Sequence, residues 1–363
     1  MPGADFRIGL AAHDLAGALG APEVVLSRAQ RDAGGPVIAS RFWLRVQALL
    51  GQDLLKRYVD DGPVMLARAV DKGLPVAPHP RPDPKPSAEQ RREDLSVTAL
   101  DRLRSDPYQF YASKILRLRE LDRLDAEPSP AWQGTLAHAI LESWHKGEGS
   151  MEALATHHLK EMHAHPLMRA LWRPRLMKAL DWIEQEVRKA PDRKPILIEE
   201  EGAITFHGVT IKGKVDRIDR AADGTLAIVD YKTGAPPTGK EVEAGFAMQL
   251  GTLGLMTRQG AFGGVAAEPT VFEYWSLGKA KDKDHPTGFG YVTTPLKTGK
   301  KKTGIEPEDF LPEAERFLTD AVTRWIVGDE GFTARLNPAA KVYAEYDQLM
   351  RLDEWMGRED AAR

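Results

Sequence analysis

The chain has 363 residues, of which 42% are hydrophobic and 28% charged, and this is ordinary for a globular protein of one large domain or two smaller ones. Because the net charge is −3, a DNA partner would have to be held by local basic patches rather than by overall charge. The absence of cysteine excludes disulfides, thiolate zinc sites, cysteine-ligated iron–sulfur clusters and a cysteine nucleophile.

The N-terminal part of the chain predicts helices and short strands. Residues 24–29 predict a short buried strand, and the helical spacing of apolar residues after Ser40 predicts a helix capped by that serine. Residues 75–87 hold six prolines, a density that neither helix nor sheet sustains, so we expect an extended linker. The predicted organisation is an N-terminal segment (1–74), a proline-rich linker (75–94) and one domain (95–363).

That domain is predicted to begin with helices. Residues 95–121 predict two of them: Thr98 to Asp101 resembles a capping box for the first, and Pro107 suits the first turn of the second. A further helix is predicted at 135–147, and a helical region at 151–190.

Strands follow. Residues 195–234 predict three consecutive strands, with tight turns at His207-Gly208 and Asp223-Gly224. A helix over 242–259, strands at 271–278 and 289–296, and a C-terminal helix over 342–357 complete the prediction.

The stretch after the third strand is ambiguous. Gly234 to Lys240 spells most of a phosphate-binding loop. Position 241, however, is glutamate instead of the serine or threonine that holds Mg²⁺, and Pro236 and Pro237 remove backbone donors. A surface loop that leads the chain out of the strand is the better interpretation, and a nucleotide-binding site the weaker alternative.

The strand before that loop offers different chemistry. Asp230 and Lys232 are two residues apart, so they share one face of the strand. A tight hairpin at Asp223-Gly224 would bring Asp216 close to Asp230, and two converging carboxylates repel each other unless a cation such as Mg²⁺ or Mn²⁺ lies between them. A metal-assisted phosphodiesterase and an exposed, salt-bridged hairpin both fit this spacing.

Four segments in order resemble the motifs of the PD-(D/E)XK nuclease superfamily, in its RecB/AddB-like branch. They are Gly134–Glu142, Gly213–Asp219, Ile228–Gly234 and Gln249-Leu250. The resemblance implies that the metal ligands are His138, Asp216, Asp230 and the backbone carbonyl of Tyr231. It also implies that the catalytic residues are Asp216, Asp230, Lys232 and Gln249.

The resemblance implies a fold and a function. We expect an α/β restriction-endonuclease-like core with a central mixed sheet flanked by helices, preceded by a helical remnant of a helicase-like domain. The activity would be Mg²⁺-dependent, or alternatively Mn²⁺-dependent, hydrolysis of a single DNA strand at a double-strand break, with an AddA-like helicase-nuclease as partner. The alternative is a non-catalytic protein that binds DNA ends and keeps remnant motifs.

Two positions depart from the pattern of that branch. Many AddB-like proteins tie this domain together with a cysteine-ligated iron–sulfur cluster, which a chain without cysteine cannot form, and Asp106 stands where one of those cysteines is often found. Leu253 replaces the tyrosine that often follows the glutamine motif. No apolar run approaches a membrane span and no signal peptide is recognisable, so we expect a cytoplasmic protein without a membrane partner.

Overall fold

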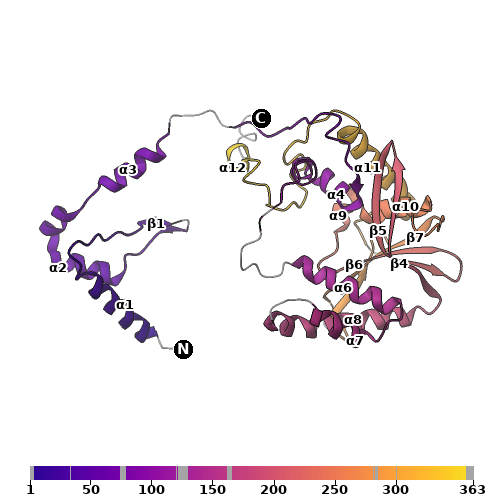
Figure 1. Ribbon diagram of the computed structural model, residues 1–363, viewed down its shortest axis with the longest axis horizontal. Coiled ribbons are helices and arrows are strands. Elements are labelled where there is room, and N and C mark those ends of the chain that lie inside the picture. The colour runs from indigo at the N-terminus through magenta and orange to yellow at the C-terminus, as the bar shows by residue number, and fades with distance from the viewer. Residues whose placement is uncertain are drawn as a thin grey trace. The chain divides into compact units, whose positions relative to one another are not determined.

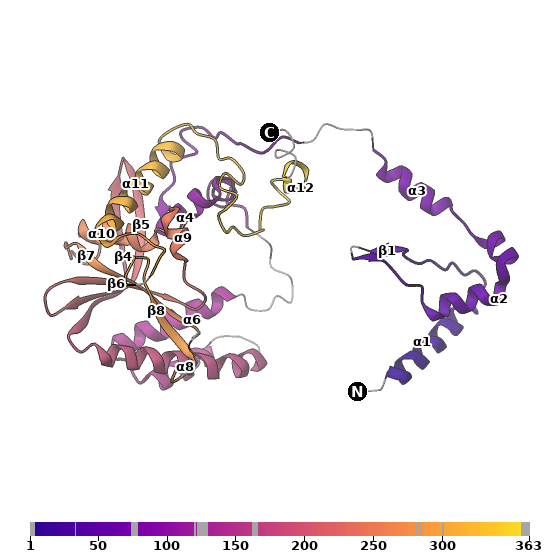
Figure 2. The ribbon, with the colours of Figure 1, turned by 180° about the vertical axis from the view of Figure 1, so that it is seen from behind.

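A computed structural model describes residues 4–32, 34–73, 79–119, 121, 130–161, 166–280, 282, 285–299 and 301–356. The chain divides into two compact units, Met1–Ala77 and Pro78–Arg363. Figures 1 and 2 show their elements from opposite sides. No helix in the described part of the chain is long and apolar enough to cross a membrane.

The first unit is built of helices and one minimal hairpin. Its elements are α1 (Ala4–Ala18), β1 (Arg31–Asp32), β2 (Gly35–Pro36), α2 (Arg41–Tyr58) and α3 (Gly62–Asp71). Ser40 caps α2 as predicted, its hydroxyl accepting the N–H of Trp43 at 3.1 Å. The strand predicted at 24–29 is wrong, because those residues are exposed and pair with no strand. None of the described residues of this unit is buried.

A six-stranded mixed sheet forms the centre of the second unit. Its strands are β3 (Leu95–Ser96), β4 (Arg193–Phe206), β5 (Val209–Ala221), β6 (Leu226–Lys232), β7 (Pro269–Lys279) and β8 (Phe289–Thr293). They lie in the order β3-β5-β6-β7-β8, with β4 also paired to β5. The β3–β5 and β6–β7 pairs are parallel and the others antiparallel. The predicted α/β fold with a central mixed sheet is confirmed.

Two tight turns set the register of the strands that carry the motifs. His207 and Gly208 both have positive φ, 47° and 77°, and they turn β4 into β5. Gly224, at φ 86°, turns β5 into β6. The β5–β6 pairing runs only as far as Arg217 and Val229. Beyond that pair the two strands part, and Asp216 and Asp230 are the next residues.

Helices cover both faces of this sheet (Figures 1 and 2). On one face lie α4 (Val97–Ser105), α9 (Gly239–Glu243), α10 (Gln249–Arg258) and α11 (Phe310–Ala321), in a core that includes Leu100, Leu253 and Phe310. On the other face lie α6 (Pro130–His145), α7 (Met151–Glu161) and α8 (Pro166–Lys189), in a core that includes Ile140, Leu180 and Trp275. Shorter helical turns are α5 (Pro107–Phe110), η1 (Tyr111–Ile115), η2 (Pro307–Asp309), η3 (Val322–Ile326) and α12 (Leu352–Trp355).

Several predicted helix boundaries are wrong. The cap of α4 is Ser96, whose hydroxyl accepts the N–H of Ala99 at 3.2 Å, and not Thr98. The helix predicted over 242–259 begins at Gln249, because Gly245 adopts φ 73° and separates it from α9. The helix predicted over 342–357 is reduced to α12, since Arg351 takes a left-handed conformation before it.

Residues 79–87, the described part of the proline-rich stretch, belong to the second unit and run along residues 332–334 as an extended strap. The carbonyls of Pro82 and Pro84 accept the N–H groups of Ala334 and Phe332, both at 2.9 Å. Proline has no N–H but keeps its carbonyl, so such a strap can accept hydrogen bonds without being a strand.

Nearby, Asp106 is fully buried and caps α5. Its Oδ1 atom accepts the N–H of Tyr108 at 3.1 Å and that of Arg335 at 3.2 Å. This aspartate thus joins two segments that are distant in the sequence.

Candidate metal centre and active site

Two carboxylates converge where β5 and β6 part. The Oδ2 atom of Asp216 accepts the backbone N–H of Tyr231 at 2.7 Å, which fixes Asp216 beside the β6 residues that follow Asp230. Burial, together with the negative charge of Asp230, raises the pKa of Asp216 to about 7. Burial also raises the pKa of Asp230. The hairpin therefore brings these two acids together as the sequence predicts.

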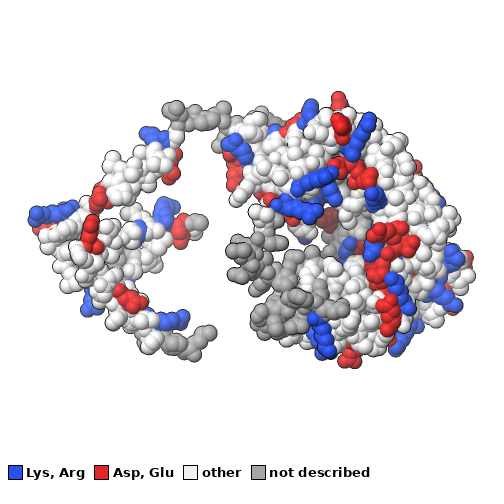
Figure 3. Space-filling model, viewed as in Figure 1, with Lys and Arg blue, Asp and Glu red and all other residues white. Residues whose placement is uncertain are grey.

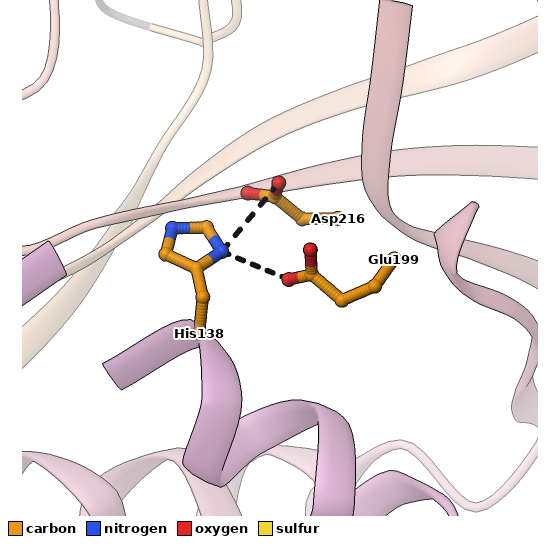
Figure 4. Close-up of side chains that lie close together, drawn as sticks. All are labelled: His138, Glu199 and Asp216. Carbon is orange, nitrogen blue, oxygen red and sulfur yellow. Dashed lines mark hydrogen bonds and ion pairs between the residues drawn. The ribbon is translucent and has the colours of Figure 1, made fainter. Parts of the chain in front are cut away.

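Three side chains from three elements meet at this point (Figure 4). The Nδ1 atom of His138, on α6, lies 2.9 Å from Oε1 of Glu199 on β4 and 3.6 Å from Oδ1 of Asp216 on β5. One nitrogen or oxygen from each side chain lies within 4.8 Å of the others, and this spacing suits a shared metal ion. Glu199 has φ 51°, a left-handed conformation that is uncommon outside glycine and occurs at functional sites.

The charged groups of this cluster stabilise one another's ionised forms. Burial lowers the pKa of His138, but Glu199, Asp216 and Asp230 outweigh it and raise that pKa to about 9. The pKa of Glu199 is lowered: burial opposes this, and its hydrogen bonds to His138 and Lys214 prevail. The Lys214 ammonium lies 2.7 Å from Oε2 of Glu199. A divalent cation would replace the proton of His138, so the donor set fits a metal at neutral or higher pH.

One ion pair and two hydrogen bonds join the three other motif residues in a closed triangle. The Lys232 ammonium lies 2.7 Å from Oδ2 of Asp230 and donates to Oε1 of Gln249 at 3.0 Å. The amide of Gln249 donates to Oδ1 of Asp230 at 2.7 Å. Asp230 is 2% exposed. The lysine, glutamine and aspartate of the motifs thus hold one another in place.

The metal ligands predicted from the sequence and the metal group in the structure share some residues but not all. His138 and Asp216 belong to the candidate metal group with Glu199, whereas the two oxygens of Asp230 lie against Lys232 and Gln249. The ligand roles of Asp230 and of the Tyr231 carbonyl stay predictions. Sequence reasoning missed Glu199, which lies in no motif.

The structure argues against a phosphate-binding loop at Gly234 to Lys240. The N-terminus of α9 is closed by a capping box, in which the Glu241 carboxylate accepts the backbone N–H and the hydroxyl of Thr238, each at 2.7 Å. A carboxylate therefore already occupies the helix end where a phosphate would have to bind, and it would repel one.

A second polar network, largely buried, surrounds the side chain of Tyr231 on β6. The hydroxyl of Tyr231 is 2.6 Å from an Arg217 guanidinium nitrogen and 3.0 Å from Nε2 of His145. Arg217 also contacts Asp219 at 2.9 Å, and Asp219 contacts Arg193 at 2.7 Å. Burial lowers the pKa of His145 to about 3, so the imidazole is neutral. This network orders the strand that carries Asp230 and Lys232.

The distribution of charged side chains on the surface is consistent with the net charge of −3. On the face drawn in Figure 3, acidic and basic side chains are interspersed. Nucleic acid on that face would therefore meet local basic groups and not one continuous patch.

Residues 94–339 match the family model described as the PD-(D/E)XK nuclease superfamily. The chain belongs to this superfamily. A PD-(D/E)XK nuclease acts on nucleic acid and generally uses a divalent metal, and the group formed by His138, Glu199 and Asp216 offers donors for one.

The alignments with curated relatives cover part of each chain. An uncharacterised Rickettsia conorii protein is 31% identical over 188 residues, 46% of this chain and 22% of the relative. An uncharacterised Rickettsia felis protein is 30% identical over 229 residues, 58% of this chain and 26% of the relative. A Streptococcus agalactiae protein, named as a subunit of an ATP-dependent helicase/deoxyribonuclease, is 28% identical over 153 residues, 39% of this chain and 14% of that protein.

The matched part of this chain is therefore a small share of much longer proteins. Among solved structures, a Eubacterium rectale protein described as a candidate exonuclease aligns with a TM-score of 0.39 at 12% identity, over 72% of this chain and 95% of that one.

Proposed function

We propose that this chain is a Mg²⁺-dependent deoxyribonuclease that hydrolyses DNA phosphodiesters as an exonuclease. The proposal rests on two clusters of side chains that lie together where the β5–β6 pairing ends. One is the metal-binding set of His138, Glu199 and Asp216, and the other is the triangle of Asp230, Lys232 and Gln249. A divalent cation bound by the first set, with Asp230 as a further ligand, would lower the pKa of the attacking water and offset phosphate charge.

The residues of the chain supply the rest of the chemistry. The side chain of Lys232 is 28% exposed, and its ammonium is held by Asp230 and Gln249. In that position it can donate to a phosphate oxygen or orient a water molecule. Asp216, held by the Tyr231 N–H, keeps its other oxygen directed at His138.

The biological role that we propose is the processing of double-strand-break ends for recombination. The chain would be the nuclease part of an AddB-like protein, acting on a single DNA strand with an AddA-like helicase-nuclease. The named Streptococcus agalactiae relative, part of a helicase/deoxyribonuclease, supports this direction. On the same proposal residues 1–74 belong to a helicase-like region.

The test is cleavage of end-labelled single-stranded DNA by purified protein with Mg²⁺, compared with EDTA. We expect Asp230→Ala and Lys232→Ala each to abolish cleavage while DNA binding persists. Lys240→Ala, which changes a lysine of the loop after β6, is the matched control and should cleave normally. Tight DNA binding by a wild-type protein that never cleaves would favour the non-catalytic end-binding role instead.

A further inference from the structure

Asp101 lies on α4, outside all four motifs, yet its carboxylate contacts the helix that carries Gln249. Its Oδ1 atom accepts the backbone N–H of Met248 at 2.8 Å, and the N–H of Gln249 is a further donor to the same carboxylate. Met248 is the N-cap of α10 and has no capping hydrogen bond from its own side chain. A residue of another helix therefore satisfies the free N–H groups at the start of α10.

The first residue of α10 is also the one that reaches the catalytic lysine. Gln249 accepts from Lys232 at 3.0 Å and donates to Asp230 at 2.7 Å. Its backbone is held by Asp101 and its side chain by the active site. Two hydrogen bonds, joined by the covalent chain of Met248 and Gln249, thus connect Asp101 on α4 to the lysine ammonium.

The surroundings of Asp101 place it close behind the site. Burial raises its pKa to about 7, although the two backbone N–H groups that bond to it and, less strongly, the positive charges of Lys232 and Arg104 lower that pKa. Tyr274, on β7 beside Asp230, has a buried hydroxyl without a hydrogen-bond partner in the described part of the chain. Burial raises the pKa of that phenol, and the charges of Asp230 and Asp101 add to the effect. Asp101 on α4 and Tyr274 on β7 are therefore close enough for the charge of one to affect the pKa of the other.

We propose that Asp101 is a positioning residue of the nuclease site. It fixes the first turn of α10 so that the amide of Gln249 stays between Lys232 and Asp230. This inference rests on the proposed nuclease activity and adds a residue to its machinery. A misplacement of about 1 Å at a reacting group can cost about 10²-fold in rate, so removing this clamp lowers the turnover rate more than it weakens DNA binding.

The experiment measures kcat and KM for single-stranded DNA cleavage with Mg²⁺. Asp101→Ala is expected to lower kcat on the order of 10²-fold at nearly unchanged KM. Asp101→Asn keeps an oxygen that accepts from Met248 and is expected to recover most of that loss. Asp106→Asn is the matched control: it alters a buried aspartate that caps α5, and it should leave kcat unchanged at temperatures where the protein is folded.

A double-mutant cycle with Gln249→Ala separates positioning from general stability. If Asp101 acts through Gln249, Asp101→Ala has no further effect on kcat once Gln249 is alanine, although it still lowers the melting temperature. Equal losses in both backgrounds, or wild-type kcat in Asp101→Ala, would overturn the proposal.

The proposed function can fail separately. If the wild type does not cleave DNA, crystal structures of Asp101→Ala and Asp101→Asn still test the clamp. We expect the distance from Gln249 Nε2 to Asp230 Oδ1, 2.7 Å here, to lengthen in the alanine variant only. An unchanged distance in Asp101→Ala would refute the positioning role.

Discussion

The two carboxylate oxygens of Glu199 contact different side chains: Oε1 lies against the His138 imidazole and Oε2 against the Lys214 ammonium. If it is a metal ligand, Glu199→Gln should weaken Mg²⁺ or Mn²⁺ binding at least about tenfold, since even groups that only orient ligands commonly contribute that much. Glu201→Gln, two residues along the same strand and exposed, is the control and should bind metal normally. Calorimetric titration measures both. Equal affinities for wild type and Glu199→Gln would remove Glu199 from the site.

The protonation of His138 and Asp216 makes the stability of the metal-free protein depend on pH. The folded protein raises both pKa values, from 6.5 to about 9 and from 3.8 to about 7. Each group therefore binds its proton more tightly when folded. Its contribution to stability is complete below the unfolded pKa and is lost as pH rises through the folded one. We expect the melting temperature in EDTA to fall between pH 5 and pH 9.

Two comparisons check that assignment. Asp216→Asn should lessen the fall below pH 7, because one of the two carboxyl groups whose pKa is raised to about 7, the other being Asp101, is gone. The stabilisation given by Mg²⁺ should grow with pH, since His138 must lose its proton to bind a metal. A metal-free melting temperature that rises steadily from pH 5 to pH 9 would contradict the raised pKa values.

At the scale of elements, Gly213 explains why α10 can lie close to β5. A Cβ atom at this position would lie 2.9 Å from Sδ of Met256 and 3.0 Å from side-chain carbons of Leu253 and Val97. Gly213→Ala should therefore push α10 from the sheet, at a cost of about 1–3 kcal/mol of unfolding free energy. Because Gln249 starts α10, kcat should fall as well. Gly234→Ala, where a Cβ meets nothing within 4 Å, is the matched control for urea unfolding and cleavage.

Part of the candidate site could be predicted from the two turns in the sequence. The turn at His207-Gly208 fixes the β4–β5 register, and counting back from it places Glu199 opposite Asp216. The position of this residue could therefore be predicted from the turn, although Glu199 belongs to no motif. In the same way the turn at Asp223-Gly224 predicts the approach of Asp216 to Asp230.

Other features depend on contacts that no local pattern encodes. Asp101 looks like part of a capping box of its own helix, but its carboxylate bonds to α10, 147 residues further along the chain. The predicted C-terminal helix has helical spacing, yet residues such as Tyr346 and Met350 are buried by turns that pack on α5 and η1. In both cases tertiary packing overrides the local preference.

At the scale of the whole molecule, the two units differ in how much they bury. The second unit has two cores on either side of its sheet, whereas no described residue of the first is buried. Val25, Ile38 and Leu49 are 84%, 92% and 82% exposed. Apolar burial stabilises a fold by about 25 cal/mol per Å², so the first unit lacks the main term that offsets chain entropy.

The two units should therefore behave differently when they are produced separately. We expect Pro78–Arg363 to unfold in one cooperative transition and to bind Mg²⁺ as tightly as the full chain does, because the candidate site and both cores lie within it. Met1–Ala77 alone should show no cooperative transition in circular dichroism and should bind a hydrophobic dye. A sharp melting transition in that fragment would mean that it holds a core of its own. If instead the isolated second unit lost its metal affinity, residues before Pro78 would have to contribute to the site.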